Sequence, residues 1–238
     1  MRKTTTGPTL SRRGALLLAA GAAAPAAAQT PPAPRAEPPK PKKLGIVLFP
    51  RFETLDVFGP VEMWGRLREY ELVTVSEHGG PVVSSQGVET VARYAFATAP
   101  RLDILMVPGG VGVRTQVGNP VMLDFLRRQD RQSEWTMSVC TGAALLARAG
   151  LLDGRKATTN KRSYPWVITQ SDAVRWQGRA RWVEDGKYIT SSGVSAGTDM
   201  ALSLVERLDG RAAAEEMADY AEYVWNSDPH NDPFAIGG

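Results

Sequence analysis

The chain has 238 residues, with 28 lysines and arginines, 25 aspartates and glutamates, 2 histidines and a single cysteine. One cysteine excludes an internal disulfide framework. The formal net charge of +3 comes from the first 43 residues, so the mildly acidic remainder gives no support for a nucleic-acid or membrane-surface partner.

The first residues carry the pattern of an export signal rather than that of a folded domain. Arg12 and Arg13 stand before a mild Ala/Leu segment, and the small residues Ala26–Ala28 follow. This pattern predicts a twin-arginine signal peptide over residues 1–28 and a periplasmic or secreted mature protein. The apolar segment is too short and interrupted to span a membrane, so we expect no membrane association after cleavage. We expect a proline-rich linker over residues 29–43 and one domain over residues 44–238.

Apolar runs alternate with amphipathic stretches along residues 44–238. Gly59 and Pro60 should interrupt the first turn of the first helix, whereas Asn119 should cap the second helix, with Pro120 at its first position. Strands are expected at 44–49, 70–75, 102–107, 135–139, 156–159 and 187–190, an edge pair within 88–97, and helices at 56–67, 120–131, directly after Cys140, 197–208 and 211–225. This alternation predicts an α/β fold, a three-layer sandwich with a mostly parallel central sheet. Ligands of such folds bind beyond the carboxyl ends of the strands.

The one cysteine stands at a predicted corner between a strand and a helix. Cys140 follows the apolar run Trp135–Val139 and precedes an Ala/Leu-rich segment that begins at Gly142. A side chain at such a corner projects above the sheet, beside the helix N–H groups that favour a thiolate. The pattern therefore predicts a nucleophile elbow. The alternative is a buried cysteine that acts as a small apolar residue.

Several segments together resemble the ThiJ/PfpI superfamily, which has the flavodoxin-like, class I glutamine amidotransferase-like fold, and within it the isonitrile hydratase branch. Their order and spacing match along the domain, from about Leu44 to Phe234. The segments are Ile46–Pro50, Leu55–Pro60, Asp103–Gly110, Ser138–Gly142, Gly150–Gly154, Lys156–Thr159 and Gly193–Gly197.

The resemblance implies Cys140 as the nucleophile, Asp56 as its acid/base partner and Thr141 as a neighbour in the site. The implied reaction hydrates an isonitrile to an N-substituted formamide through a thioimidate on the cysteine, with no metal or cofactor. Gly109 and Gly110 should line the substrate site, where the backbone N–H groups of Gly110 and Thr141 could stabilise negative charge. From its position alone, Asp56 could equally bond the N–H groups at the start of its own helix.

The chain departs from many of these relatives at one position. After Lys-Ala-Thr-Thr they have a histidine that pairs with the cysteine, whereas this chain has Asn160. Asparagine cannot accept a proton, and the two histidines, His78 and His230, do not follow an expected strand near the elbow. A Cys-His dyad therefore lacks its base. Asn160 should either orient substrate or water, or serve as a turn residue.

A second elbow-like motif, Gly193–Gly197, fits the G-x-S-x-G pattern of serine hydrolases. With His230 and Asp228, Ser195 would form a serine esterase. An α/β-hydrolase needs further strands after its nucleophile, but only two helices and a tail are expected after Ser195. We therefore expect a tight glycine-rich turn beside the Cys140 elbow.

The remaining expectations concern binding. Asp228, His230 and Asp232 could be metal ligands, but a surface loop is the more common structure for such a tail. The tryptophans should fill the core and a subunit face, and one or two could line an apolar substrate pocket. A small-molecule substrate and a homodimer are expected. A non-catalytic, redox-responsive or small-molecule-binding protein is the alternative. A DNA-binding regulator is disfavoured, because no helix-turn-helix segment follows residue 230.

Overall fold

A seven-stranded sheet organises the described part of the chain, residues 40–236 of this computed structural model. The predicted signal peptide and most of the predicted linker lie outside the described residues. Neighbouring strands are parallel except for β10, which is antiparallel to β11. The strand order is β10 (Trp182–Asp185), β11 (Tyr188–Ser191), β7 (Trp135–Ser138), β6 (Ile104–Val107), β1 (Lys42–Val47), β2 (Tyr70–Ser76) and β5 (Tyr94–Ala95).

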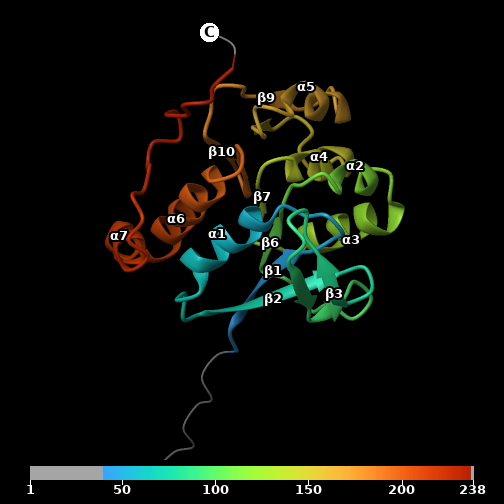
Figure 1. The fold of residues 1–238 in the computed structure, drawn as a ribbon, viewed down its shortest axis with the longest axis horizontal. Helices are drawn as coiled ribbons and strands as arrows, with labels where there is room; N and C mark the ends of the chain where they lie inside the picture. The colour runs from blue at the N-terminus through green and yellow to red at the C-terminus, as the bar shows by residue number, and fades with distance from the viewer. Residues whose placement is uncertain (1–39, 237–238) are drawn as a thin grey trace, which may run out of the picture. The chain divides into compact units, whose positions relative to one another are not determined.

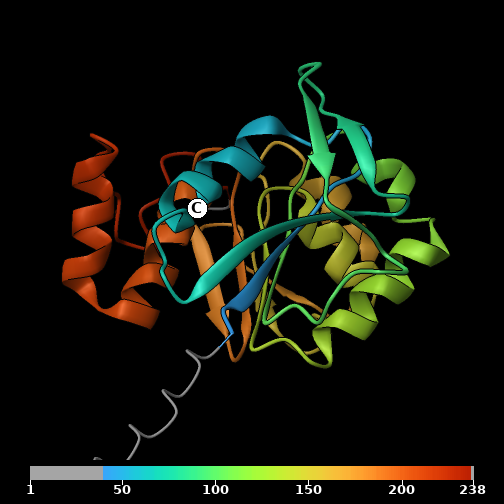
Figure 2. The ribbon, with the colours of Figure 1, turned by 90° about the horizontal axis from the view of Figure 1, so that it is seen from below.

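Helices cover both faces of this sheet, which gives three layers (Figures 1 and 2). On one face α1 (Thr54–Trp64) packs against α6 (Ala196–Asp209), and α7 (Arg211–Tyr220) packs on α6. The other face is covered by α2 (Val113–Gln116), α3 (Pro120–Asp130) and α4 (Gly142–Arg148). The central strand β6 is buried along its whole length, which explains why its sequence is a continuous apolar run. The predicted three-layer α/β fold is confirmed.

The smaller elements lie outside the main sheet. A hairpin pairs β3 (Gly80–Val83) with β4 (Glu89–Ala92), and β8 (Lys156–Ala157) pairs with β9 (Arg175–Trp176). The short helix α5 (Tyr164–Val167) and the 3₁₀ turn η1 (Ile168–Gln170) lie between β8 and β9 in the chain. None of the helices within residues 40–236 has the length and apolar composition needed to cross a bilayer.

Some predicted boundaries are wrong. Strand β1 begins at Lys42, so the last two residues of the predicted linker belong to the sheet. The predicted strand 156–159 stops at Ala157, because Thr158 and Thr159 turn to form bonds with Thr190 and with the Cys140 carbonyl. Strand β10 and the short helices α2 and α5 were not expected from the sequence.

Helix α7 ends at Tyr220, five residues before the predicted end at Trp225. Glu222 adopts a left-handed backbone with a φ of 49°, and the Tyr223 N–H donates to the Ala218 carbonyl at 2.9 Å. This bond spans five residues and is the kind that closes a helix C-terminus. The chain beyond Tyr220 is therefore an irregular tail.

Helix α1 is continuous through Pro60 instead of restarting there. Proline has no N–H to donate to the Asp56 carbonyl, so one helical bond is missing at this point. Gly59 allows α6 to approach α1 closely, because a Cβ at this position would lie 2.5 Å from Thr198 Oγ1. The contact between Gly59 and Thr198 holds α1 against α6, one turn after Asp56.

Replacing Gly59 with alanine should lower the free energy of unfolding by roughly 1–3 kcal/mol, because the added methyl group overpacks the α1–α6 contact. The midpoint of urea unfolding measures this loss. Adding Thr198→Ala should restore most of the stability, since Oγ1 is the atom in the way. Gly118→Ala is the control, because its Cβ would meet no atom closer than 3.7 Å. Wild-type stability of Gly59→Ala would contradict the close approach.

Candidate active site

The predicted site residues meet at the carboxyl ends of adjacent strands. Cys140 follows β7, the Gly109–Gly110 turn follows β6, and Asp56 lies in the first turn of the helix after β1. Strand β1 lies between β2 and β6. The chain therefore passes from β1 to its neighbour β2, and later adds β6 along the opposite edge of β1. Such a switch point is where ligands bind in open α/β sheets. The structure thus brings Asp56, Gly109 and Cys140 together as expected.

The Cys140 backbone has the strained conformation of an elbow. Its φ is 55°, a left-handed value that costs a non-glycine residue about 1–3 kcal/mol. Two long-range bonds hold it: the Cys140 N–H donates to the Ser192 carbonyl at 3.1 Å, and the Cys140 carbonyl accepts from Thr159 Oγ1 at 2.8 Å. Segments far away in sequence therefore stabilise the corner.

Two glycines leave space around the Asp56 and Cys140 side chains. A Cβ at Gly109 would lie 2.6 Å from the Thr141 backbone nitrogen and 2.9 Å from Asp56 Oδ2. A Cβ at Gly193 would lie 3.0 Å from Cys140 Sγ and 2.1 Å from Asn160 Nδ2. Any larger residue at either position would displace these groups.

The Asp56 carboxyl is completely buried. Its Oδ2 accepts the Gly109 N–H at 2.8 Å, whereas its Oδ1 has no hydrogen-bond partner among the described residues. Burial raises the pKa of Asp56 well above its usual value, and the charge of Glu53 raises it further. The Gly109 N–H and the Cys140 side chain act in the opposite direction. Asp56 is thus not the cap of α1, a position that Glu53 occupies.

The surroundings of the Cys140 sulfur favour the thiol over the expected thiolate. Only 6% of the residue is exposed, and burial raises the pKa of Cys140 well above the usual thiol value. The charge of Asp56 raises it further, while the Thr141 N–H lowers it. Desolvation therefore outweighs the favourable dipoles at the start of α4.

The Gly110 N–H is already bonded. It donates to Thr141 Oγ1 at 3.0 Å, so it does not face the sulfur as an open donor. The Thr141 N–H, in contrast, bonds to the Cys140 side chain. Of the two backbone donors expected to stabilise negative charge, only that of Thr141 is in position.

Asn160 has the turn role that the sequence allowed, and its side chain also lies beside the sulfur. Its Oδ1 accepts the Ser163 N–H at 2.9 Å, as in an Asx turn. Its Nδ2 and Cys140 Sγ both lie close to the position that a Cβ on Gly193 would occupy. The amide nitrogen can thus serve as a donor next to the sulfur.

A cavity of about 360 Å³ lies at this end of the sheet. No tryptophan lines it: Trp64 is buried in the core, and Trp176 and Trp182 line a different cavity. The apolar wall predicted from tryptophans consists of other residues instead. The lining residues are Leu55, Asn160, Lys161, Arg162, Ser192, Gly193, Val194, Ser195 and Phe234.

The esterase residues do not assemble. Ser195 has an ordinary helical backbone, with a φ of −67°, where α6 begins. His230 lines the cavity of Trp176 and Trp182, not that of Ser195. The motif Gly193–Gly197 is instead the glycine-rich turn expected beside the elbow.

In the described part of the chain, Asp228, His230 and Asp232 do not form a group of three side chains that could hold a metal ion. Asp228 and His230 are exposed, as expected of a surface loop. Asp232 contradicts that prediction: it is buried and pairs with Lys161 at 3.6 Å.

Sequence reasoning missed three residues around the site. Ser192 holds the elbow, and Leu55 and Phe234 line the cavity. Thr159, at the end of an expected strand, also holds the elbow, and Leu55 stood in a segment already singled out for the family resemblance. Phe234 had no local signal, because its position depends on the path of the tail.

Comparisons with known proteins agree with this fold. The profile of the DJ-1/PfpI family matches residues 42–207. The isonitrile hydratase of Pseudomonas putida is 35% identical over 76% of this chain and 78% of its own length. A crystal structure of a ThiJ/PfpI family protein from Pseudomonas syringae superposes with a TM-score of 0.72 at 32% identity, covering 83% of this chain and 79% of that one.

A regulator is also similar. GbdR, an HTH-type transcriptional regulator of Pseudomonas aeruginosa, is 33% identical over 80% of this chain, which spans only 53% of the regulator. Drosophila DJ-1beta shares the fold with a TM-score of 0.69, at 22% identity over 78% of this chain and all of that one.

Alkylation of Cys140 by iodoacetamide should be slow at neutral pH and should accelerate only above the ordinary thiol pKa of about 8.5. Burial and the Asp56 charge both favour the protonated sulfur, so the raised pKa moves the profile to higher pH. Asp56→Asn removes the charge and should shift the profile back towards lower pH. Mass spectrometry at a series of pH values measures the rates, with no other cysteine to interfere. A wild-type profile that titrates below the ordinary thiol value would contradict the buried-thiol description.

Proposed function

Because the chain belongs to the DJ-1/PfpI family, we propose that it is an enzyme that hydrates isonitriles to N-substituted formamides. One observation carries the proposal: the Cys140 side chain lies against a buried carboxyl, that of Asp56, whose Oδ1 has no hydrogen-bond partner among the described residues. A buried polar atom without a partner is costly, and such an atom next to a nucleophile is suited to proton transfer.

The first step is the addition of the thiol to the terminal carbon of the isonitrile. The sulfur bonds to this carbon, and the thiol proton passes through Asp56 Oδ1 to the same carbon, which gives a thioimidate. The S–H bond breaks while S–C and C–H bonds form, so neither an oxidant nor a cofactor is needed. A protonated resting thiol suits this step, because the addition consumes the sulfur and the proton together.

The second step is the addition of water to the thioimidate carbon. Asp56 accepts a proton from the water as its oxygen bonds to the carbon, and passes a proton to the substrate nitrogen, so that the carbon carries a hydroxyl group. Collapse then breaks the S–C bond, returns a proton to the sulfur and releases the formamide. One carboxyl group can serve both steps, since burial raises its pKa and so helps it to hold a proton and return it.

The polar groups around the sulfur fit this cycle. The Thr141 N–H supports negative charge on the departing sulfur. The Asn160 amide and Cys140 Sγ both lie next to Gly193. We propose this amide as the hydrogen-bond donor to the substrate nitrogen. The Gly109 N–H keeps Oδ2 of Asp56 engaged, which leaves Oδ1 for the protons.

A redox-sensing role for Cys140 has weaker support. Redox-sensor cysteines are accessible and have a low pKa, whereas Cys140 is buried and its pKa is raised. The similarity to regulators covers only about half of their length and gives no argument about this cysteine.

Purified wild-type protein should convert cyclohexyl isonitrile to N-cyclohexylformamide, followed by the formyl proton in NMR spectra. Cys140→Ala should abolish turnover, and Asp56→Asn should lower kcat/KM by roughly 10²–10⁴-fold, because the proton carrier is lost. Asp172→Asn, at an exposed carboxylate, is the matched control and should behave like wild type. Undiminished formamide production by Cys140→Ala would reject the mechanism.

We also propose that the chain is exported through the twin-arginine pathway and works as a homodimer. The signal at Arg12 and Arg13 supports the first part, and the second rests on the family resemblance. Replacing both arginines with lysine should retain the protein in the cytoplasm of a fractionated host cell. Light scattering should give twice the monomer mass for the mature protein. Unchanged export of the double variant would refute the pathway, and a monomer mass would refute the dimer.

A further inference from the structure

The tail after α7 returns to the end of the sheet that carries the site. It runs from α7 towards β9 and α5 (Figure 1). Along this path the Arg181 N–H donates to the Pro229 carbonyl at 2.7 Å, and the Ile236 N–H donates to the Gly178 carbonyl at 3.2 Å. Backbone bonds at two points therefore attach the tail to the loop between β9 and β10.

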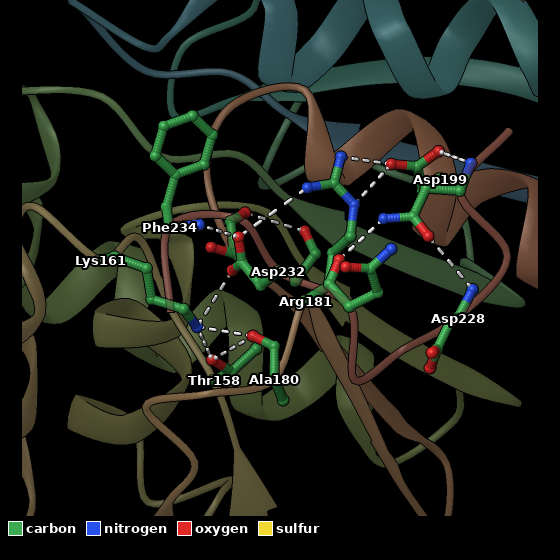
Figure 3. Close-up of polar contacts among 12 residues, drawn as sticks. Thr158, Lys161, Ala180, Arg181, Asp199, Asp228, Asp232 and Phe234 are labelled. Atoms are coloured by element: carbon green, nitrogen blue, oxygen red, sulfur yellow. Dashed lines mark hydrogen bonds and ion pairs between the residues drawn. The ribbon is translucent and has the colours of Figure 1, made fainter. Parts of the chain in front are cut away.

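A buried group of charges strengthens this attachment. Asp232 of the tail lies between Lys161, at 3.6 Å, and Arg181, at 4.0 Å (Figure 3). Arg181 also binds Asp199 of α6 through Nε at 2.7 Å and through Nη2. Asp199 in turn accepts the Tyr223 hydroxyl at 2.9 Å. Two positive and two negative groups balance each other, and removing one partner of such a buried pair is costly.

This anchor touches the segment that supports the cysteine. Lys161 Nζ donates to Thr158 Oγ1 at 2.6 Å, and the next residue, Thr159, bonds to the Cys140 carbonyl. Asn160, between Thr159 and Lys161, lies beside the sulfur. The position of the tail and the geometry of the site are thus tied through four consecutive residues.

Phe234 stands two residues beyond the anchor. Its N–H donates to Asp232 Oδ1 at 3.0 Å, and it lines the cavity of Asn160 and Gly193 together with Leu55 and Val194. Phe234 is 66% exposed. A single exposed aromatic residue is common, but this one is held at a cavity wall by a buried ion pair.

We propose that Phe234 determines substrate specificity, because its ring, with Leu55 and Val194, forms the apolar wall for the organic substituent of the compound that Cys140 attacks. Asp232 is the positioning residue that holds the ring there. The identity of this compound as an isonitrile rests on the proposed function, whereas the wall should act on any small electrophile that reaches the sulfur. We therefore expect bulky apolar substituents to be preferred over a methyl group.

The first test compares cyclohexyl with methyl isonitrile. In Phe234→Ala the ratio of kcat/KM for cyclohexyl over methyl should fall roughly tenfold, which corresponds to about 1.4 kcal/mol of lost apolar contact. The change should come mainly from KM for the larger substrate, and Phe234→Leu should retain part of the preference. Tyr220→Ala removes an aromatic residue of similar exposure, 64%, and should leave the ratio unchanged. An unchanged ratio in Phe234→Ala would overturn the proposal.

The role of Asp232 is tested by a double variant. Asp232→Asn should shift the ratio in the same direction as Phe234→Ala, and combining the two should add nothing to Phe234→Ala alone, because both act through one ring. Loss of rate on both substrates to the same extent would reduce Asp232 to a structural residue. If Asp232→Asn does not fold, the Phe234 variants still decide the proposal.

A second measurement separates this inference from the proposed reaction. The labelling rates of Cys140 with iodoacetamide and with N-benzyl iodoacetamide do not depend on isonitrile turnover. The wild type should favour the benzyl reagent relative to free cysteine, and Phe234→Ala should lose that preference. Loss of the preference in a protein that hydrates no isonitrile would support Phe234 and reject the hydratase. Hydration with identical labelling preferences in both proteins would do the reverse.

Discussion

Cys140 keeps its left-handed backbone because two hydrogen bonds hold it, one through its N–H and one through its carbonyl oxygen. One bond comes from Ser192, directly after β11, and the other from Thr159, after β8. The corner is therefore a tertiary product rather than a local turn, and it exists only when β7 and β11 are paired. The position of the sulfur beside Asp56 and Asn160 follows from this one strained residue.

The sulfur and the Asp56 carboxyl define the chemistry through a shared lack of water. Burial disfavours the ionisation of each group, and the charge of Asp56 raises the pKa of Cys140 further, so this environment favours a protonated thiol beside the carboxyl. A Cys-His dyad works differently, because the imidazole removes the thiol proton before attack. Asn160 cannot do that. The proposed reaction, in which one carbon receives both the sulfur and its proton, suits a protonated Cys140 beside Asp56.

The order of strands and helices could be predicted because periodicity and turn residues are local properties, and the meeting of Asp56, Gly109 and Cys140 followed from parallel strand ends. The protonation state of Cys140 could not, since desolvation depends on everything packed around the sulfur. The partner of the Gly110 N–H depended on the rotamer of Thr141. The role of Asp232 depended on a long path of the tail, which no pattern in its sequence indicates.

The absence of a side chain at Gly193 has an evolutionary consequence. One methyl group at this position would lie against both Sγ and the Asn160 amide, while the strands that build the sheet would be untouched. A single nucleotide change, from glycine to alanine, would therefore displace groups of the proposed site while the cysteine stays in the sequence. In paralogues of this protein, the residue at this position would separate chains that use the thiol from chains that only carry it.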